Sequence, residues 1–314
     1  MERAFHGSNS DRGSVGYLGP AGTFTEEALL SQKDLSEMSI VAMTSITEVI
    51  EAASSGDIDY GFVPIENSIE GTVLATLDSL LFDADLLIQR EVSLEVHQNL
   101  LAVSGTDISE IREVYSYPVA TAQVRYFLRN NLPQAEIKAS TSTAEAAKFV
   151  AASKDRTKAA IAPMAAAKEY GLEAIRASIE DHPGNETRFL LLHRRHIPKP
   201  TGNDKTTVVC FQVTDRPGSL LSILAQFSAR GINLTKLDSR PTRRQLGEYC
   251  FIIDLEGHIA DSLVADCLRE LRTTLPELKF LGSYPSSRSP KVDESNNSPQ
   301  RGAQDWIDEL RGRI

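Results

Sequence analysis

An alternation of short apolar segments with amphipathic helical segments, which continues to about residue 193, constrains the fold of this chain most. VGYLG (15–19) and MSIVAM (38–43) have the composition of strands, and each precedes a segment with helical periodicity, FTEEALLSQ (24–32) and SITEVIEAASSG (45–56). A strand–helix alternation of this kind is typical of open parallel sheets covered by helices. The sequence therefore predicts an α/β fold for this part of the chain.

Two stretches break the alternation. The run from Leu86 to Val103 is too long for one strand, and NETRFLLLH (185–193) is a second extended apolar segment far along the chain. Together they would supply two crossings between two lobes. We expect residues 15–193 to form a two-lobed domain of the periplasmic-binding-protein type (type II), with a cleft between the lobes.

A different pattern follows the segment RRHIPKPTGNDK (194–205), whose proline, glycine and polar residues are typical of a linker. Residues 206–285 read as strand, helix, strand, strand, helix and strand, with the first helix starting at Pro217 and stopping at Gly231. This βαββαβ order predicts a ferredoxin-like module. Residues 1–14 are expected to form a disordered leader, and residues 286–314 a low-complexity tail that contains a short amphipathic helix.

Composition excludes several classes of function. The formal net charge of −10 argues against nucleic acid as a partner, because phosphate neutralisation needs a basic face. No run of 18 apolar residues exists, which argues against a membrane-spanning helix. The three cysteines form no CxxC pair and lie in apolar runs, so we interpret them as free thiols of a cytoplasmic protein. His193 and His196 have no ligand partners at metal-binding spacing, and we expect no metal and no cofactor.

Polar side chains gather at the ends of predicted segments, where open α/β sheets place ligands. Each group also has a structural interpretation, as a helix cap, a solvated surface or an exposed strand edge. The candidates are Thr23 in GPAGTFT (19–25), Glu66, Asn67 and Ser68 in VPIENSIEGT (63–72), Ser116 and Gln123 in YSYPVATAQ (115–123), and Thr187, Arg188 and Phe189 in GNETRF (184–189).

The segments GPAGTFT, VPIENSIEGT, YSYPVATAQ, STAEAA (142–147) and NETRF occur in the order and spacing of the prephenate dehydratase family, which the chain resembles over residues 15–285. RPGSLLSIL (216–224) and LTKLDSRP (234–241) resemble the two signatures of the family's C-terminal ACT regulatory domain. Asp238 stands where that signature usually has glutamate.

The resemblance implies conversion of prephenate to phenylpyruvate, with loss of carbon dioxide and water, in phenylalanine biosynthesis. It assigns the essential hydroxyl to Thr187, with Glu66 as the alternative proton source and Asn67 beside it. Arg188, Asn67 or the N–H groups around Thr23 would hold the pyruvyl carboxylate. Ser116 and Gln123 would orient the substrate from the other lobe.

The resemblance also implies that L-phenylalanine binds the C-terminal domain as an allosteric effector, between copies of a homodimer or homotetramer. Gly218 opens a helix whose N–H groups could meet a carboxylate. The expected effector-binding residues are Gly218, Ser219, Leu220, Asn233, Leu234, Asp238, Ser239, Arg240 and Pro241.

Two alternatives remain open from the sequence. Arogenate dehydration would use the same fold with an amino-acid substrate. A non-catalytic amino-acid sensor would use the same two-lobed cleft and C-terminal domain. Retention of Thr187 with Glu66, Asn67 and Gln123 speaks against the sensor.

Overall fold

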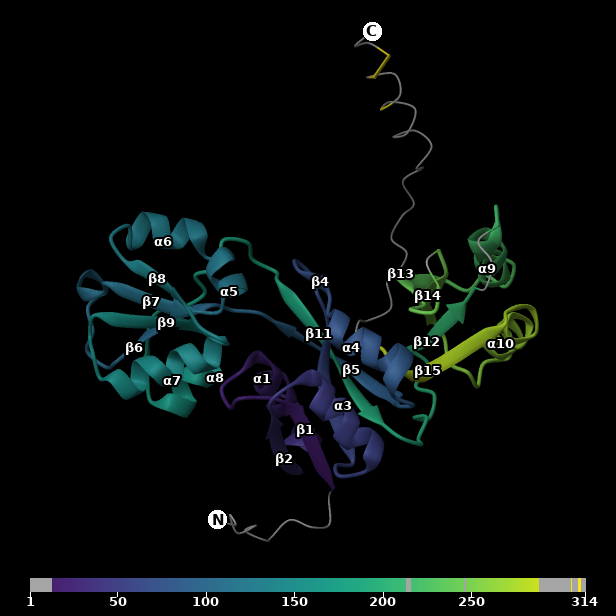
Figure 1. Ribbon diagram of the computed structural model, residues 1–314, viewed down its shortest axis with the longest axis horizontal. Helices are drawn as coiled ribbons and strands as arrows, with labels where there is room; N and C mark the ends of the chain where they lie inside the picture. Colours follow the sequence, from purple (N-terminus) through teal and green to yellow (C-terminus); the bar gives the residue numbers. More distant parts are fainter. Residues whose placement is uncertain (1–12, 213–215, 246, 288–305, 307–309, 312–314) are drawn as a thin grey trace.

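The computed structural model of the chain describes residues 13–212, 216–245, 247–287, 306 and 310–311. Three sheets divide it into two lobes and a C-terminal domain, which lie in a row with the first lobe in the middle (Figure 1). This arrangement confirms the predicted two-lobed α/β fold with a separate βαββαβ domain. Residues 1–12 of the expected leader and most of the tail, including Ile307 of its amphipathic helix, lie outside the described residues, and Ser14 already belongs to strand β1.

Lobe 1 is built on a six-stranded sheet with the order β2-β1-β3-β11-β5, to which β4 adds by pairing with β3. The strands β1 to β3 are parallel, whereas β11 returns antiparallel between β3 and β5. Its elements are β1 (Ser14–Leu18), α1 (Phe24–Leu30), α2 (Lys33–Ser36), β2 (Ser39–Met43), α3 (Ile46–Ser55), β3 (Tyr60–Asn67), β4 (Gly71–Thr72), α4 (Leu74–Asp78), η1 (Ser79–Asp83), β5 (Leu87–Glu95) and β11 (Glu186–His193).

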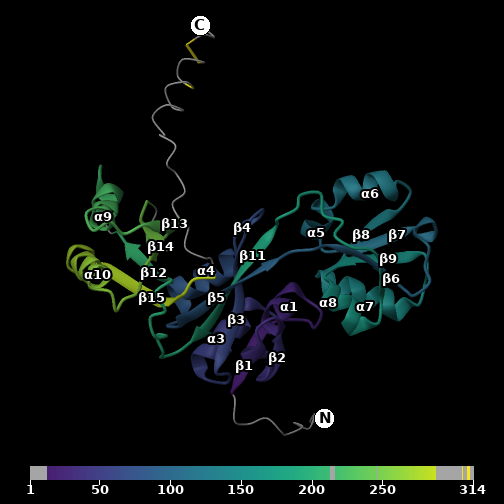
Figure 2. The same ribbon diagram turned by 180° about the vertical axis from the view of Figure 1, so that it is seen from behind.

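Lobe 2 has a five-stranded sheet with the order β10-β6-β9-β7-β8. Its elements are β6 (Asn99–Ala102), η2 (Ile108–Glu110), β7 (Glu113–Ser116), α5 (Pro118–Ala122), α6 (Arg125–Asn131), β8 (Glu136–Ala139), α7 (Thr143–Ser153), β9 (Lys158–Ala162), α8 (Met164–Tyr170) and β10 (Glu173–Arg176). The chain passes between the lobes twice, from β5 to β6 and from β10 to β11, as the two long extended segments predicted. Figure 2 shows both crossings from behind.

The C-terminal domain has the strand order β13-β14-β12-β15 with both helices on one face. Its elements are β12 (Asp204–Phe211), α9 (Ser219–Ser228), β13 (Leu234–Pro241), β14 (Tyr249–Glu256), α10 (Ser262–Thr274) and β15 (Glu277–Pro285). The opposite face of this sheet packs on lobe 1, because Val209, Ile252 and Leu281 belong to the same buried apolar cluster as Ile65 and Leu77. The C-terminal domain therefore shares a core with lobe 1.

Candidate functional site

Strands β3 and β11 place neighbouring residues on opposite faces of lobe 1. Thr187 is paired with Asn67 and Arg188 with Glu66, but Phe189 is paired with Pro64, so Ile65 is an extra residue in β3. Because side chains alternate along a strand, this β-bulge brings Asn67 into phase with Thr187 and Glu66 into phase with Arg188. Asn67 and Thr187 thus share one face, and Glu66 and Arg188 share the other.

The side chain of Thr187 belongs to a network of neutral polar groups. The amide Nδ2 of Asn67 donates to Thr187 Oγ1 at 2.9 Å and to Asn185 Oδ1 at 2.8 Å. Its Oδ1 accepts from the backbone N–H groups of Ile69 and Glu70, each at 3.0 Å. Both ends of the Asn67 amide are therefore fixed, and so is the position of the Thr187 oxygen.

This network continues into lobe 2. Asn185 Nδ2 and Gln98 Nε2 both donate to Gln123 Oε1, each at 3.2 Å. Gln98 and Asn185 lie in the two crossings, and each is only 2% exposed. A chain of amides therefore joins Thr187 of lobe 1 to Gln123 of lobe 2 through the segments that connect the lobes. Gln98 Oε1 is buried and has no partner among the described residues, which leaves an acceptor available at this junction.

Sequence reasoning missed Asn185 and Gln98. Both lie inside or next to the segments proposed as crossings, GNETRF and the run 86–103. An amide in an extended apolar segment is a signal of a buried polar contact, because an unpaired buried amide is costly. That signal was available, but it does not identify the partner.

Two further candidates lie near this junction with their side chains already engaged. Ser68 Oγ donates to Asn185 Oδ1 at 3.3 Å and accepts from the backbone of Glu186 at 2.9 Å. Thr23 Oγ1 caps α1 by accepting from the N–H of Glu26 at 3.3 Å. The adjacent N–H of Gly22 donates to the Glu26 carboxylate at 2.6 Å. A carboxylate of the chain itself therefore already binds next to the N-terminus of α1. The segment 68–72 forms a hairpin that leads into β4.

The contacts of Ser116 agree with its structural interpretation and not with a role at the lobe junction. Its hydroxyl is fully buried and donates to the backbone carbonyl of Ile161 at 2.8 Å, within the sheet of lobe 2. The expectation that Ser116 orients a substrate at the junction is therefore not met by its contacts. Gln123 is the residue of the same motif that reaches lobe 1.

The side chains of Arg188 and Phe189 make their contacts away from Thr187, and their expected role in substrate binding stays a prediction. Arg188 points away from Thr187, and its Nη1 donates to Glu91 at 3.1 Å and to Asp254 of the C-terminal domain at 2.9 Å. Phe189 is 1% exposed and stacks on Phe62 in the core of lobe 1, with ring centroids 5.4 Å apart. The alternation of β11 explains both results, because Phe189 is on the face of Thr187 that packs into the core of lobe 1, and Arg188 is on the opposite face, which packs against the C-terminal domain.

Glu66 also faces the C-terminal domain. Its carboxylate lies 3.4 Å from Arg188 Nη2 and 3.2 Å from Lys236 Nζ. Both carboxylate oxygens are thus engaged by cations, on the face of the sheet opposite Thr187. Of these two candidates, Thr187 is the one that belongs to the amide network at the lobe junction.

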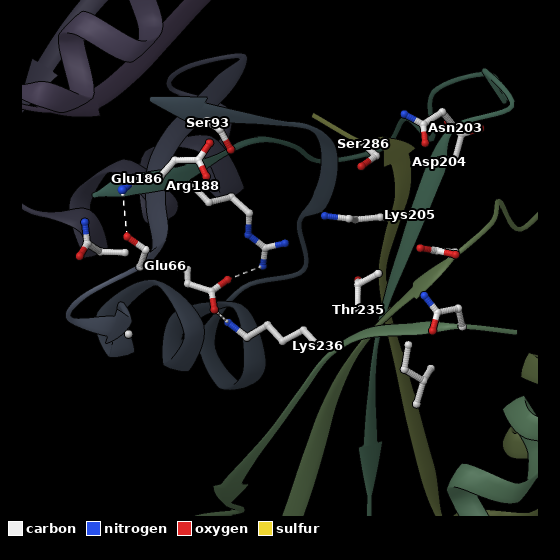
Figure 3. A pocket seen from close by; sticks show the side chains of 16 residues that line it. Glu66, Ser93, Glu186, Arg188, Asn203, Asp204, Lys205, Thr235, Lys236 and Ser286 are labelled. Atoms are coloured by element: carbon white, nitrogen blue, oxygen red, sulfur yellow. Dashed lines mark hydrogen bonds and ion pairs between the residues drawn. The ribbon is translucent and has the colours of Figure 1, made fainter. Parts of the chain in front are cut away.

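A cavity of about 690 Å³ lies between lobe 1 and the C-terminal domain (Figure 3). Residues from both sides line it, among them Glu66, Ser68 and Arg188 of lobe 1 and Asn233, Leu234 and Lys236 of the C-terminal domain. Two expected effector residues therefore border this cavity. Asn67 also lines it, whereas Thr187 does not.

The other expected effector residues divide between two locations. Asp238 accepts from Thr72 Oγ1 at 2.9 Å, and Arg240 Nη2 lies 2.8 Å from Asp78, so both point to lobe 1. Ser239 and Pro241 lie on the exposed side of β13, as their alternation requires. Gly218 has a φ of +87° and precedes α9, which explains why glycine suits the position, and Ser219 and Leu220 follow in that helix.

Two other features are absent from the described residues. These residues contain no group of three or more histidine, cysteine, aspartate or glutamate side chains placed to hold a metal ion. None of the described helices is long and apolar enough to cross a membrane.

Comparison with known proteins decides the family. The family model for prephenate dehydratase matches residues 15–197, more than half of the chain. This chain belongs to the prephenate dehydratase family. The ACT domain model matches residues 206–273, so the C-terminal domain is an ACT domain.

Relatives of similar length support this assignment. A prephenate dehydratase of Mycolicibacterium vanbaalenii is 40% identical over 95% of this chain and 98% of its own. The crystal structure of a prephenate dehydratase from Arthrobacter aurescens, solved in complex with L-Phe, is 36% identical, covers 95% of this chain and 99% of its own, and has a TM-score of 0.82. A structure described as a novel type of quorum quenching acylase is 29% identical, covers 88% of this chain and 98% of its own, and has a TM-score of 0.79. Since a shared fold can carry different activities, the residues of the site must support the activity.

Proposed function

We propose that this chain converts prephenate to phenylpyruvate at the junction of its two lobes, with Thr187 as the hydroxyl group that acts on the departing hydroxide. The observation that carries this proposal is the hydrogen bond from Asn67 Nδ2 to Thr187 Oγ1. Asn67 donates in this bond, so the proton of the Thr187 hydroxyl remains free for another acceptor. Thr187 can therefore donate to the hydroxyl group of a substrate.

The reaction breaks two bonds of the substrate. The ring carboxylate leaves as carbon dioxide, its electron pair moves into the ring, and the ring hydroxyl departs and takes up a proton to become water. Hydroxide is a poor leaving group, so a donor aimed at its oxygen lowers the barrier. A threonine hydroxyl is a weak acid, so we assign to Thr187 a hydrogen bond or a proton relay rather than free acid catalysis. The bond that it accepts from Asn67 polarises the hydroxyl and strengthens its donation.

The neutral side chains around Thr187 suit the charges of the reaction. The ring carboxylate loses its charge in the transition state, so a cation fixed beside it would stabilise the substrate more than the transition state. Arg188 points to the ACT domain, and amide groups surround Thr187 instead. Amide donors of Asn67, Asn185, Gln98 and Gln123 could hold the pyruvyl carboxylate if the substrate displaced their mutual hydrogen bonds.

We further infer that L-phenylalanine binds the ACT domain and inhibits the enzyme. The motif residues around Gly218 and in β13 support this inference, together with the L-Phe complex of the Arthrobacter relative. Strand β13 is an edge strand, and Leu237 on its outer side is 45% exposed. A second copy of the chain could cover that edge, and we therefore propose a homodimer or a dimer of dimers.

The three buried free cysteines suit a reducing compartment, and we place the enzyme in the cytoplasm.

The catalytic proposal is tested by incubating the purified chain with prephenate and following the absorbance of phenylpyruvate. Arogenate is the matched alternative substrate, with phenylalanine as its product. We expect turnover of prephenate at least about ten-fold more efficient than that of arogenate, a difference in kcat/KM that one unpaired polar group can produce. Higher efficiency with arogenate would reverse the substrate assignment, and turnover of neither would refute the dehydratase.

The regulatory proposal is tested on the full chain with Gly218→Val. Deleting the ACT domain would be unsuitable, because its sheet shares a buried core with lobe 1. We expect Gly218→Val to abolish inhibition by phenylalanine and to keep basal turnover, because a side chain at a φ of +87° disturbs the entry of α9.

The matched control is Gly231→Val, which introduces a side chain at a φ of +65° after the same helix. It imposes similar backbone strain at the opposite end, and we expect normal inhibition. Equal inhibition of the unaltered chain and Gly218→Val would place the effector elsewhere.

A further inference from the structure

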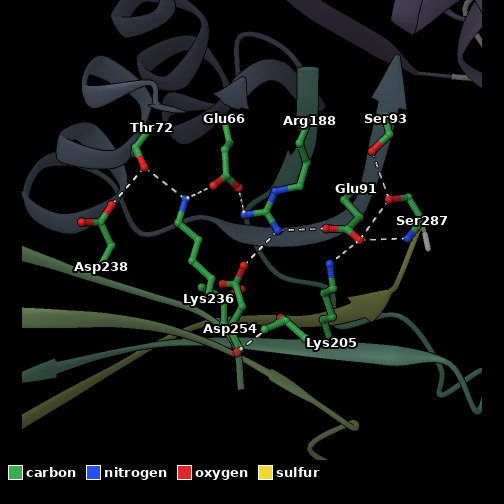
Figure 4. Close-up of polar contacts among 12 residues, drawn as sticks. Glu66, Thr72, Glu91, Ser93, Arg188, Lys205, Lys236, Asp238, Asp254 and Ser287 are labelled. Atoms are coloured by element: carbon green, nitrogen blue, oxygen red, sulfur yellow. Dashed lines mark hydrogen bonds and ion pairs between the residues drawn. The ribbon is translucent and has the colours of Figure 1, made fainter. Parts of the chain in front are cut away.

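Four charged side chains join the ACT sheet to the strand pair that carries Thr187 and Asn67 (Figure 4). Glu66 and Arg188 come from lobe 1, and Lys236 and Asp254 come from β13 and β14; we call these four residues the interdomain cluster. Arg188 lies 2.9 Å from Asp254 and 3.4 Å from Glu66, and Lys236 lies 3.2 Å from Glu66. Opposite charges from the two domains therefore alternate across the interface.

Three of the four side chains of the interdomain cluster are largely removed from solvent, whereas that of Glu66 is 37% exposed. The side chain of Asp254 is 2% exposed, that of Lys236 12% and that of Arg188 15%. Burial alone would lower the pKa of Arg188, but Asp254, together with Tyr284 and Glu91, more than offsets this effect, and the pKa is raised. Removing one partner from a buried ion pair leaves an uncompensated charge, so such pairs resist separation. The two domains are thus held firmly at this point.

Each lobe 1 member of the cluster adjoins a residue of the proposed active site. Arg188 follows Thr187 in β11, and Glu66 precedes Asn67 in β3. A displacement of Arg188 or Glu66 by a fraction of an ångström moves its neighbour, because the two residues share a peptide unit in a paired strand. Misplacement of a catalytic group by about 1 Å can cost on the order of 10²-fold in rate.

The ACT members lie close to the expected effector residues. Lys236 and Asp238 lie on the same side of β13, and both contact Thr72, Lys236 through its Nζ at 3.2 Å and Asp238 at 2.9 Å. Thr72 is paired with Glu66 through β4. A shift of β13 therefore reaches Glu66 directly and also through the β3–β4 hairpin.

We propose that the interdomain cluster positions Thr187 and Asn67 for catalysis and carries the effect of a ligand bound at the ACT domain to them. Lys236 and Asp254 are positioning residues in this scheme, since they act through Glu66 and Arg188. The transfer of an effector's signal through the cluster rests on the function proposed above, whereas the positioning of Thr187 and Asn67 does not require an effector. An effector inhibits by binding better to the state in which β13 has moved relative to lobe 1.

The positioning of Thr187 and Asn67 by the interdomain cluster is tested with Asp254→Asn. Thr207 Oγ1 donates to Asp254 at 2.8 Å in this structure, and asparagine keeps both the size of the side chain and this acceptor. We expect kcat to fall about ten-fold or more with KM changed less than about three-fold, the pattern of a lost transition-state interaction. Asp254→Glu should recover part of the loss. A kcat within about two-fold of the unaltered chain for Asp254→Asn would overturn positioning by the cluster.

A second readout needs no turnover. Hydrogen exchange of the β11 amides, residues 186–193, should be faster in Asp254→Asn than in the unaltered chain. The control is Arg243→Met, which removes an ion pair to Asp78 at 2.6 Å across the same interface but touches neither β3 nor β11. Unchanged exchange in Asp254→Asn, or equal changes in both variants, would contradict the proposal even if the chain acted on another substrate.

The transfer of an effector's signal is tested with Lys236→Met against the same control. We expect Lys236→Met to bind phenylalanine in calorimetry within about three-fold of the unaltered chain, and to need about ten-fold more phenylalanine for half-inhibition. Arg243→Met should be inhibited normally. Normal inhibition of Lys236→Met would overturn signal transfer by the cluster. Failure of phenylalanine to inhibit the unaltered chain would refute both the proposed effector and this transfer, and the Asp254 experiments would still decide the positioning role.

Discussion

Arg188 and Thr187 show at the scale of single residues that neighbours in one motif can serve different parts of the molecule. Thr187 accepts from Asn67 at the lobe junction, whereas Arg188 lies between Glu91 and Asp254. Burial alone would raise the pKa of Glu91, but Arg188 and Lys205 lower it below its usual value. Glu91 is therefore ionised at neutral pH, and it needs the positive charge of Arg188.

The first prediction follows from these contacts. Arg188→Met should reduce the free energy of unfolding by about 3–5 kcal/mol, because it leaves the buried carboxylate of Asp254 without its ion-pair partner and that of Glu91 with Lys205 alone. The KM for prephenate should change by less than about three-fold, because the guanidinium is not at the substrate. Urea unfolding and steady-state kinetics measure the two quantities. A large rise in KM with unchanged stability would show instead that Arg188 binds the substrate.

At the scale of elements, the crossing from β5 to β6 contains a titratable contact. His97 Nδ1 lies 2.9 Å from Glu180 Oε1, and the other oxygen of Glu180 accepts from the N–H of Gln98 at 2.9 Å. The hydrogen bond to Glu180 raises the pKa of His97 above its usual value. The protonated histidine therefore holds the crossing next to Gln98, one of the amides at the lobe junction.

The pH dependence has a definite sign. A histidine with a raised folded pKa contributes stability that is fully present below its unfolded pKa of about 6.5 and is lost as the pH rises through the folded value. His97→Gln should therefore destabilise the protein more at pH 6 than at pH 8.5, by less than about 1 kcal/mol because the side chain is half-exposed and screened. Thermal unfolding of both proteins at the two pH values measures this difference. An equal loss at both values would show that His97 contributes no charge at the crossing.

At the scale of the whole molecule, the sequence predicted the features that local patterns encode. Strand and helix periodicity predicted the two lobes, the long run 86–103 predicted one crossing, and Pro217 and Gly231 bounded the region of α9. These predictions held because hydrophobic alternation and turn residues act within a few residues of one another. The motif residues Asn67, Thr187 and Gln123 were also identified in this way, and the structure brings them into one network.

The features that sequence reasoning missed depend on contacts between distant segments. The extra residue Ile65 sets the phase of β3 against β11, and no local pattern marks it as a bulge. The ACT domain docks on lobe 1 through a shared core, and this docking gives Arg188 its partner Asp254. The direction of Arg188 could not be read from the sequence because both determinants lie outside its own strand.

The central claim of this account is that Thr187 acts on the leaving hydroxide. The most direct test is the kcat of Thr187→Ala with prephenate, beside Thr187→Ser as the matched variant that keeps a hydroxyl. We predict that the alanine variant folds normally and loses about 10²-fold or more in kcat, and that the serine variant loses much less, because a positioned donor contributes effects of that size. A kcat for Thr187→Ala close to that of the unaltered chain would contradict the account.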